Sequence, residues 1–119
     1  DPVELIINWA TKRFSELEAA GIDKKRIILD PGIGFGKDAG QSQTIINNIE
    51  RFKSLGVPVL VGHSRKSFLG TIVGRGVNER TPATLAAEIY ISYMGVDYIR
   101  THDVRALSDA LKVLGMLNC

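Results

Sequence analysis

Apolar residues recur at intervals of three and four positions in four segments of the chain, which is the spacing that gathers side chains on one face of a helix. Glycines follow the first three segments at Gly21, Gly56 and Gly95, where helices commonly end. Asp1 and Asp103 precede the first and last segments, in the position of a helix N-cap. The apolar stripes consist of Val3, Ile6, Ile7, Ala10, Phe14 and Leu17; Ile45, Ile46, Ile49, Phe52 and Leu55; Leu85, Ala86, Ile89, Tyr90 and Tyr93; and Val104, Leu107, Leu111 and Leu114. The pattern predicts four amphipathic helices.

Three short runs between these helices lack the helical period; the first two are mainly aliphatic, and the third contains Tyr98 and Ile99 among polar residues. They are residues 27–29, 57–62 and 97–103, and we predict a strand in each. Strands joined by helical crossovers are parallel, and continuous aliphatic runs are typical of strands covered on both faces. The order of elements therefore predicts an α/β chain of parallel βα units, with residues 1–119 in a single domain.

Polar residues follow the end of each predicted strand. The first strand leads to Asp30 and residues 32–37, the second to residues 63–67 and the third to residues 100–103. The opposite ends of the strands carry ordinary turn sequences. Because the carboxyl ends of parallel strands meet at one rim, where α/β proteins bind their ligands, the sequence predicts a site at this rim.

The glycine-rich stretch "IILDPGIGFGK" at 27–37 does not fit the common phosphate-binding loops. Gly32 and Gly36 are separated by three residues rather than four, and Asp38 follows Lys37 where a P-loop has Ser or Thr. The dinucleotide fingerprint fails as well, because its third glycine would come one residue later. Two interpretations of Asp30 remain, a tight turn and a carboxylate that meets a ligand.

The rim combines one carboxylate, Asp30, with the cationic side chains of Arg65, Lys66 and Arg100. A guanidinium grips a phosphate through two hydrogen bonds, whereas a carboxylate accepts from a donor pair such as the amino-amide edge of a pterin or guanine. The glycines after Asp30 let the backbone approach a flat ligand, and Phe35 offers a ring face. These rim residues together predict a ligand that is a flat heterocycle with an anionic tail.

Simpler interpretations exist for several of these residues. Arg65 and Lys66 would be an ordinary surface pair if they stood alone, and Lys37 fits a solvated loop residue. His102 fits a helix start, and Asp103 is better explained as an N-cap than as a catalyst. The functional interpretation rests on the three polar sets falling at equivalent positions of consecutive strands.

Composition narrows the possible partners. Hydrophobic residues make up 45% of the chain and charged residues 24%, with a formal net charge of +2, which is too small to indicate a nucleic acid or an anionic membrane as partner. The single cysteine, Cys119, permits no internal disulfide and favours the cytoplasm. No apolar run approaches the roughly 20 residues of a membrane span.

Three stretches in order, "ILDPGIGFGK", "LVGHSRKSFLG" and "YIRTHDV", resemble the last three strand ends of the dihydropteroate synthase family. The resemblance implies a C-terminal part of a TIM (β/α)8 barrel, with three strands and about four main helices. It further implies a transferase of folate biosynthesis, which joins a dihydropterin-methyl diphosphate to para-aminobenzoate and releases diphosphate. Ala83 stands where the family pattern has glycine, at a helix start away from the rim.

The resemblance also implies roles for residues at the rim, and none of them is an acid or a base. It assigns the pterin to Asp30, Lys66 and Arg100, the diphosphate to Arg100, Thr101 and His102, and the aminobenzoate site, where sulfonamides compete, to Phe35 and Ser67.

A whole barrel takes about 250 residues, so the chain resembles only part of one. It begins at Asp1 rather than at Met, and we interpret residues 1–119 as a single partial domain. We expect a magnesium ligand in the N-terminal half, a homodimer for the full-length enzyme, and no turnover by the fragment alone. Two alternatives remain: a pterin-binding module of the methyltetrahydrofolate methyltransferase type, and a non-catalytic fragment that self-associates through its strand edges.

Overall fold

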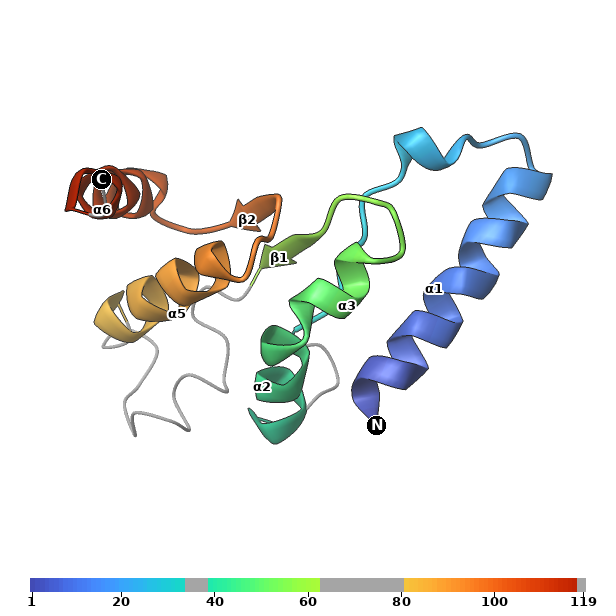
Figure 1. Cartoon of the computed structure of the whole chain (residues 1–119), viewed down its shortest axis with the longest axis horizontal. Helices are drawn as coiled ribbons and strands as arrows, with labels where there is room; N and C mark the ends of the chain where they lie inside the picture. Colours follow the sequence, from blue (N-terminus) through green and yellow to red (C-terminus); the bar gives the residue numbers. More distant parts are fainter. Residues whose placement is uncertain (34–38, 63–80, 118–119) are drawn as a thin grey trace.

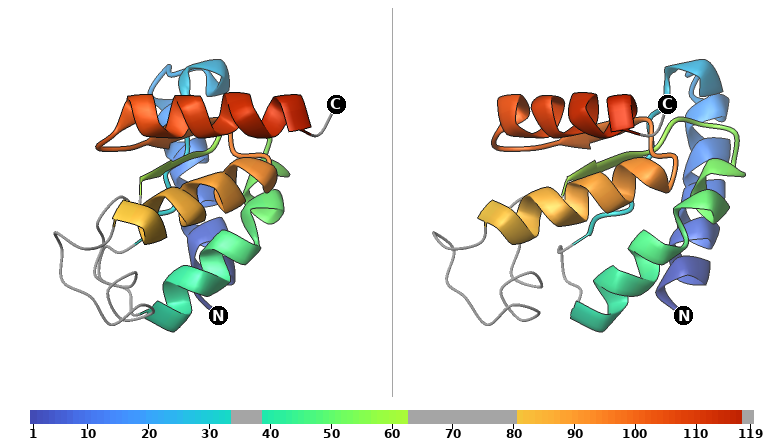
Figure 2. Two further views of the ribbon diagram at one scale, coloured as in Figure 1. Left: turned by 90° about the vertical axis from the view of Figure 1, so that its left-hand side faces the viewer. Right: turned by 60° about the vertical axis from the view of Figure 1, so that its left-hand side comes forward.

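The computed structural model describes residues 1–33, 39–62 and 81–117 (Figure 1). In chain order its elements are α1 (Pro2–Ala19), the 3-10 helix η1 (Lys24–Arg26), α2 (Ala39–Asn47), α3 (Ile49–Lys53), β1 (Leu60–Gly62), α5 (Thr81–Tyr93), β2 (Tyr98–Arg100) and α6 (Val104–Leu117). Helices α1 and α6 lie toward opposite ends of the molecule, with the strands between them (Figures 1 and 2). The predicted α/β class is confirmed.

The strand segments lie side by side and parallel, in the order in which they occur in the chain. Strand β1 pairs with β2, with Val61 beside Ile99 and Gly62 beside Arg100. On the other side of the same run, Leu29 forms an isolated parallel bridge to Val59. The Leu29 N–H donates to the Pro58 carbonyl at 2.8 Å, and the Leu60 N–H donates to the Leu29 carbonyl at 2.8 Å. The parallel arrangement predicted from the helical crossovers is therefore present.

The prediction of a strand over residues 27–29 is wrong in extent, because only Leu29 pairs. The N–H of Ile27 is occupied by the turn that precedes it, since it donates to the Lys24 carbonyl and closes η1. Ile28 is 51% exposed. The 3-10 turn thus delays the start of the pairing by two residues.

One face of this small sheet carries the core. Helices α1, α2, α3 and α5 pack on it, and the buried cluster consists of Val3, Ala10, Leu29, Ile33, Ile45, Ile46, Ile49, Phe52, Val57, Val59, Val61 and Ile91. On the opposite face Ile28 and Tyr98 are each 51% exposed, whereas Leu60 of β1 is half-buried and Gly62 is buried. The expectation that both faces of the strands are covered therefore fails at Ile28 and in β2, whereas no residue of β1 is exposed.

The predicted caps are confirmed. The Val3 N–H donates to Asp1 Oδ1 at 3.0 Å, and the Ala106 N–H donates to Asp103 Oδ1 at 3.0 Å at the start of α6. Gly95 has a φ of +88°, a left-handed conformation that suits glycine after a helix. Local side-chain chemistry therefore fixes these element boundaries.

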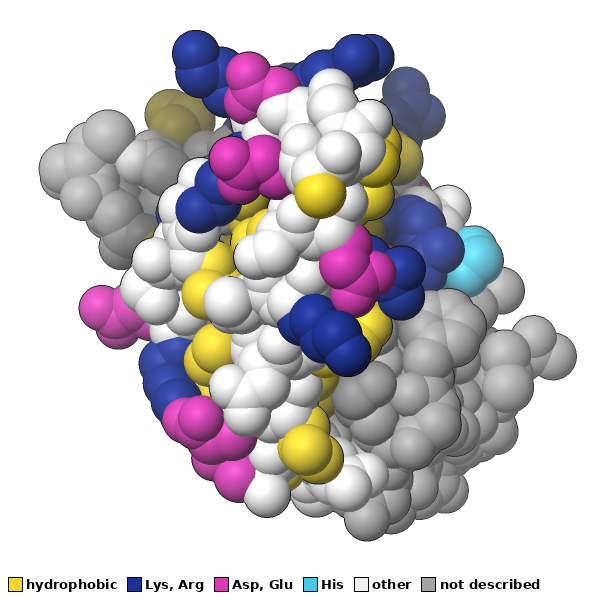
Figure 3. Space-filling model, turned by 90° about the vertical axis from the view of Figure 1, so that its right-hand side faces the viewer, with side chains coloured by type: hydrophobic (Ala, Val, Ile, Leu, Met, Phe, Trp, Pro, Cys, Tyr) yellow, Lys and Arg dark blue, Asp and Glu magenta, His cyan; other side chains and the backbone are white. Residues whose placement is uncertain are grey.

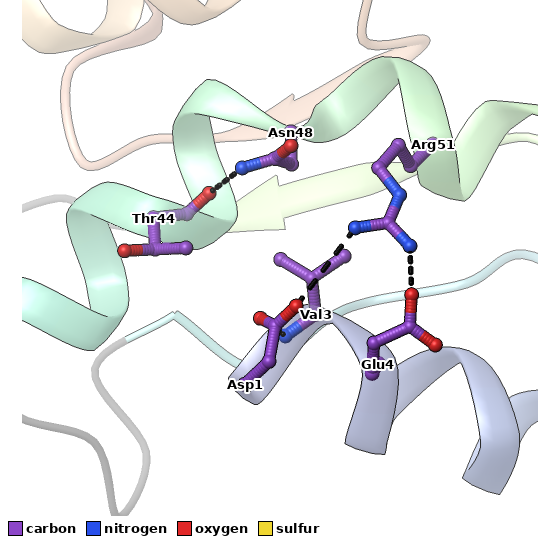
Figure 4. A network of polar contacts seen from close by, with 6 residues as sticks. All are labelled: Asp1, Val3, Glu4, Thr44, Asn48 and Arg51. Carbon is purple, nitrogen blue, oxygen red and sulfur yellow. Dashed lines mark hydrogen bonds and ion pairs between the residues drawn. The ribbon is translucent and has the colours of Figure 1, made fainter.

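The helix predicted around Ile45–Leu55 is instead two helices, α2 and α3, which meet at Asn48. The Asn48 side chain donates to the Thr44 carbonyl at 2.7 Å, and its backbone adopts φ −121°, ψ 24° (Figure 4). An asparagine that hydrogen-bonds back to the preceding turn competes with helical geometry, which explains the break. Arg51 of α3 then forms ion pairs with Glu4 and, at 4.0 Å, with Asp1, which joins α3 to the start of α1 (Figure 4).

The face of α5 that packs on the core differs from the predicted one. The helix buries Thr84, Glu88 and Ile91, whereas Tyr90 is 48% and Tyr93 61% exposed. Apolar residues occur all around this helix, so periodicity alone could not fix which side turns inward. Val104 of α6, also predicted to be internal, is 69% exposed, while Leu107 is buried as predicted.

Candidate functional site at the carboxyl ends of the strands

Asp30 follows the bridging residue Leu29 and is exposed. Its Oδ1 accepts the Gly32 N–H at 2.8 Å, and Gly32 has a φ of +76°. The turn interpretation is therefore confirmed. Within the described residues this carboxylate has no ion-pair partner, and a carboxylate has about four lone-pair sites, of which the turn uses one. Asp30 thus combines a fixed position with free acceptor capacity.

An open cavity with a volume of about 470 Å³ lies beside Asp30, between the start of α1 and the turn. Leu5 and Trp9 of α1 line it, and they are 69% and 52% exposed. The side of the molecule that lies on the right in Figure 1 shows apolar side chains at several points between charged ones (Figure 3). Gln41 of α2 adds a polar amide. The cavity provides an apolar wall next to the carboxylate.

Sequence reasoning missed Trp9. It is the only tryptophan of the chain and stands beside the apolar stripe of its helix rather than in it. The Arg13 guanidinium lies 5.9 Å from the centre of its ring. An aromatic residue outside the core stripe, on the helix that leads into the first strand segment, was the available signal.

Arg100 is the last residue of β2 and pairs with Gly62 of β1. Its guanidinium lies over this glycine: a Cβ on Gly62 would be 2.5 Å from Arg100 Nε and 2.6 Å from Nη2. Because the three strand segments are parallel, Asp30 and Arg100 stand at the same end of the sheet, as predicted. One carboxylate and one guanidinium thus stand at the same rim, on the two segments that flank β1.

Thr101 and His102 connect β2 to α6. The Asp103 N–H donates to Thr101 Oγ1 at 3.3 Å, while Asp103 itself caps α6. Thr101 is half-buried and lines a second open cavity of about 460 Å³ with Leu107 of α6, whereas His102 is exposed. Phe35, Lys66 and Ser67 lie outside the described residues, as do Lys37, His63 and Arg65.

Asp97, the first residue of the third predicted strand, makes structural contacts at the opposite end of the strands. Its Oδ2 accepts the Val59 N–H at 2.9 Å, and its Oδ1 lies 3.6 Å from Lys53 Nζ. Lys53 also donates to the Gly95 carbonyl at 2.6 Å. The aspartate thereby supplies the acceptor for a backbone N–H just before β1 begins.

Two negative findings concern the residues that the structure describes. They contain no group of three or more His, Cys, Asp or Glu side chains placed to hold a metal ion. None of their helices is both long and apolar enough to cross a membrane.

Comparison with known proteins gives consistent matches. The family model of pterin-binding enzymes matches residues 1–102. A dihydropteroate synthase type-3 of Escherichia coli is 45% identical over 112 residues, which are 91% of this chain and 42% of that protein. The dihydropteroate synthase of Xanthomonas albilineans in complex with 7,8-dihydropteroate is 37% identical, with a TM-score of 0.94, and the match covers 100% of this chain and 46% of that one. The same enzyme with 4-aminobenzoic acid matches with the same identity and TM-score, over 44% of its chain. The present chain therefore spans less than half the length of these relatives.

Proposed function

Because this chain belongs to the family of pterin-binding enzymes, we propose that it is the C-terminal portion of a dihydropteroate synthase. The reaction is the condensation of (7,8-dihydropterin-6-yl)methyl diphosphate with para-aminobenzoate, with release of diphosphate, in folate biosynthesis. Residues 1–119 form one partial domain, part of a (β/α)8 barrel that the rest of the synthase completes. The parallel order of the strand segments supports this placement.

One observation carries the proposal: the parallel strand ends bring a carboxylate, Asp30, and a guanidinium, Arg100, to the same rim. These groups suit the two ends of a pterin diphosphate, because a carboxylate accepts from the amino-amide edge and a guanidinium binds an anionic oxygen. The complexes of the Xanthomonas albilineans synthase with 7,8-dihydropteroate and with 4-aminobenzoic acid are in keeping with such ligands.

The proposed roles follow the resemblance. Asp30 and Lys66 bind the pterin, and Arg100 stacks on it and holds the diphosphate with Thr101 and His102. Phe35 and Ser67 border the aminobenzoate site, where sulfonamides compete.

The main requirement of the reaction is that the diphosphate leaves. The bond between the pterin methylene carbon and the diphosphate oxygen breaks, positive charge develops on the methylene, and the amine nitrogen of para-aminobenzoate forms the new bond and loses a proton. Cationic side chains at the rim favour the step because they stabilise the charge that develops on the diphosphate. The attacking arylamine is neutral, so the proposal assigns no general base.

The described residues do not fit a magnesium site, because they hold no cluster of carboxylate, histidine or cysteine ligands. We therefore assign no ligand of the ion to them and propose that the complete synthase binds it elsewhere. We further propose that the complete enzyme is a homodimer and works in the cytoplasm, where proteins with little cysteine and no disulfides are common.

A titration with the pterin diphosphate tests the role of Asp30. It uses the whole natural polypeptide that contains residues 1–119, as wild type and as Asp30→Asn. The variant retains an oxygen for the Gly32 N–H but loses the charge and gains a donor, so we expect affinity to fall about a hundredfold or more. Equal affinities would remove Asp30 from the pterin site.

Asp23→Asn is the matched control. Asp23 Oδ1 accepts the N–H of Lys25, two residues later, at 2.9 Å, just as Asp30 Oδ1 accepts the N–H of Gly32. It lies at the other end of the strand segment and should leave the affinity unchanged. In a parallel assay of diphosphate release, residues 1–119 alone are expected to show no turnover, because they supply only part of the site.

A further inference from the structure

Gly62 is a glycine for reasons of space rather than backbone conformation. Glycines such as Gly21 and Gly95 have φ near +90°, where side chains are strained, but Gly62 has no such φ. What a side chain at position 62 would meet is the guanidinium of Arg100, with Nε at 2.5 Å, Nη2 at 2.6 Å and Cζ at 2.9 Å from the Cβ position. Gly62 is buried although Arg100 is exposed, in agreement with a guanidinium that lies across it.

This placement moves the charge of Arg100 toward Asp30. Arg100 belongs to β2, whereas Gly62 belongs to β1, and the segment that carries Asp30 pairs on the far side of β1. Neighbouring strands are about 4.8 Å apart, so a guanidinium folded over Gly62 lies roughly one strand nearer to Asp30 than its own backbone does. The missing side chain at position 62 is what leaves room for it.

We propose that Gly62 is a positioning residue for Arg100: it keeps the guanidinium over β1, where it holds the anionic tail of a ligand whose heterocycle is held by Asp30. The inference deepens the proposed function and rests on it. A methyl group at position 62 displaces the guanidinium, which is the flexible end of a long side chain, and leaves the pairing of β1 with β2 in place. Gly62→Ala therefore tests the effect of moving the Arg100 guanidinium without disrupting the fold.

The test is a double-mutant cycle on the whole natural polypeptide that contains residues 1–119, with Gly62→Ala, Arg100→Ala and the double variant. Each protein is titrated with the pterin diphosphate and with the uncharged hydroxymethylpterin, and the NMR signal of the Arg100 Nε–H is recorded. Gly115→Ala is the matched control, because nothing lies within 4 Å of a Cβ at that position.

If Gly62 acts through Arg100, Gly62→Ala weakens binding of the diphosphate at least about tenfold, the scale of one lost charge-assisted hydrogen bond. It weakens binding of hydroxymethylpterin far less, shifts the Nε–H signal, and has no added effect once Arg100 is alanine. Gly115→Ala changes none of these quantities.

Two outcomes overturn the inference while leaving the proposed function intact. One is wild-type affinity in Gly62→Ala with an unmoved Nε–H signal, and the other is an equal loss of affinity with and without the Arg100 side chain. A wild-type protein that binds neither pterin refutes the proposed function, and the role of Gly62 in holding a ligand falls with it.

Discussion

Replacement of Asp97 by alanine should destabilise the protein by about 2 kcal/mol, although the residue lies at the end of the sheet away from the rim. The variant leaves the N–H of Val59 without its partner at 2.9 Å, and Val59 is fully buried. A buried donor that loses its partner costs about 1–3 kcal/mol. The ion pair with Lys53 is also lost, but both side chains are more than a third exposed, so it adds about 0.5 kcal/mol.

Asp97→Asn separates these two contributions. The amide oxygen still accepts the Val59 N–H, so only the charge is lost, and we expect a cost of about 0.5–1 kcal/mol. Asp109→Ala serves as the control, because this aspartate of α6 is exposed and forms no hydrogen bond or ion pair with the described residues. Its stability should lie within about 0.5 kcal/mol of wild type.

Urea unfolding followed by circular dichroism measures the free energy of unfolding for all four proteins, with an unchanged m-value as the condition for comparing them. The expected order of stability is wild type and Asp109→Ala, then Asp97→Asn, then Asp97→Ala. If Asp97→Ala is as stable as wild type, or if the asparagine and alanine variants are equally destabilised, the hydrogen bond to Val59 does not hold the start of β1 and our reasoning is wrong.

Two further predictions concern the helix ends and the link between helices. Gly95→Ala should lower the free energy of unfolding by about 1 kcal/mol because φ is +88° there, whereas Gly115→Ala, inside α6, should raise it by up to about 1 kcal/mol; equal effects in urea unfolding would contradict this. Arg51→Ala should cost no more than about 1 kcal/mol, because its ion pairs with Asp1 and Glu4 are roughly half exposed; a loss above 2 kcal/mol in the same assay would show that solvent screens this network less than we expect.

The candidate site was only partly predictable from sequence. The place of Asp30 and Arg100 at one rim follows from the parallel order of strands, which the helical crossovers impose. The turn at Asp30 is confirmed, because Oδ1 accepts the Gly32 N–H, whereas the role of this carboxylate in binding a ligand stays a prediction. Trp9 escaped notice because its proximity to Asp30 depends on how α1 packs against the following turn.

The sequence by itself determined the features that depend on neighbours in the chain. Asp1 and Asp103 cap their helices through bonds to N–H groups two and three residues away, and Gly95 ends α5 because few other residues adopt its φ. Such contacts form whatever the rest of the molecule does, so local residue chemistry is enough to predict them.

Tertiary structure alone decided the features that depend on distant partners. The burial of Glu88 rather than Tyr90 on α5 reflects which side of a largely apolar helix fits the core, and Asp97 became structural because Val59, 38 residues earlier, presents its N–H there. The guanidinium of Arg100 over Gly62 likewise joins two strands that a helical crossover separates in sequence. Local sequence patterns do not distinguish between these arrangements. Packing does, because close contacts between residues distant in the chain exist only once it has folded.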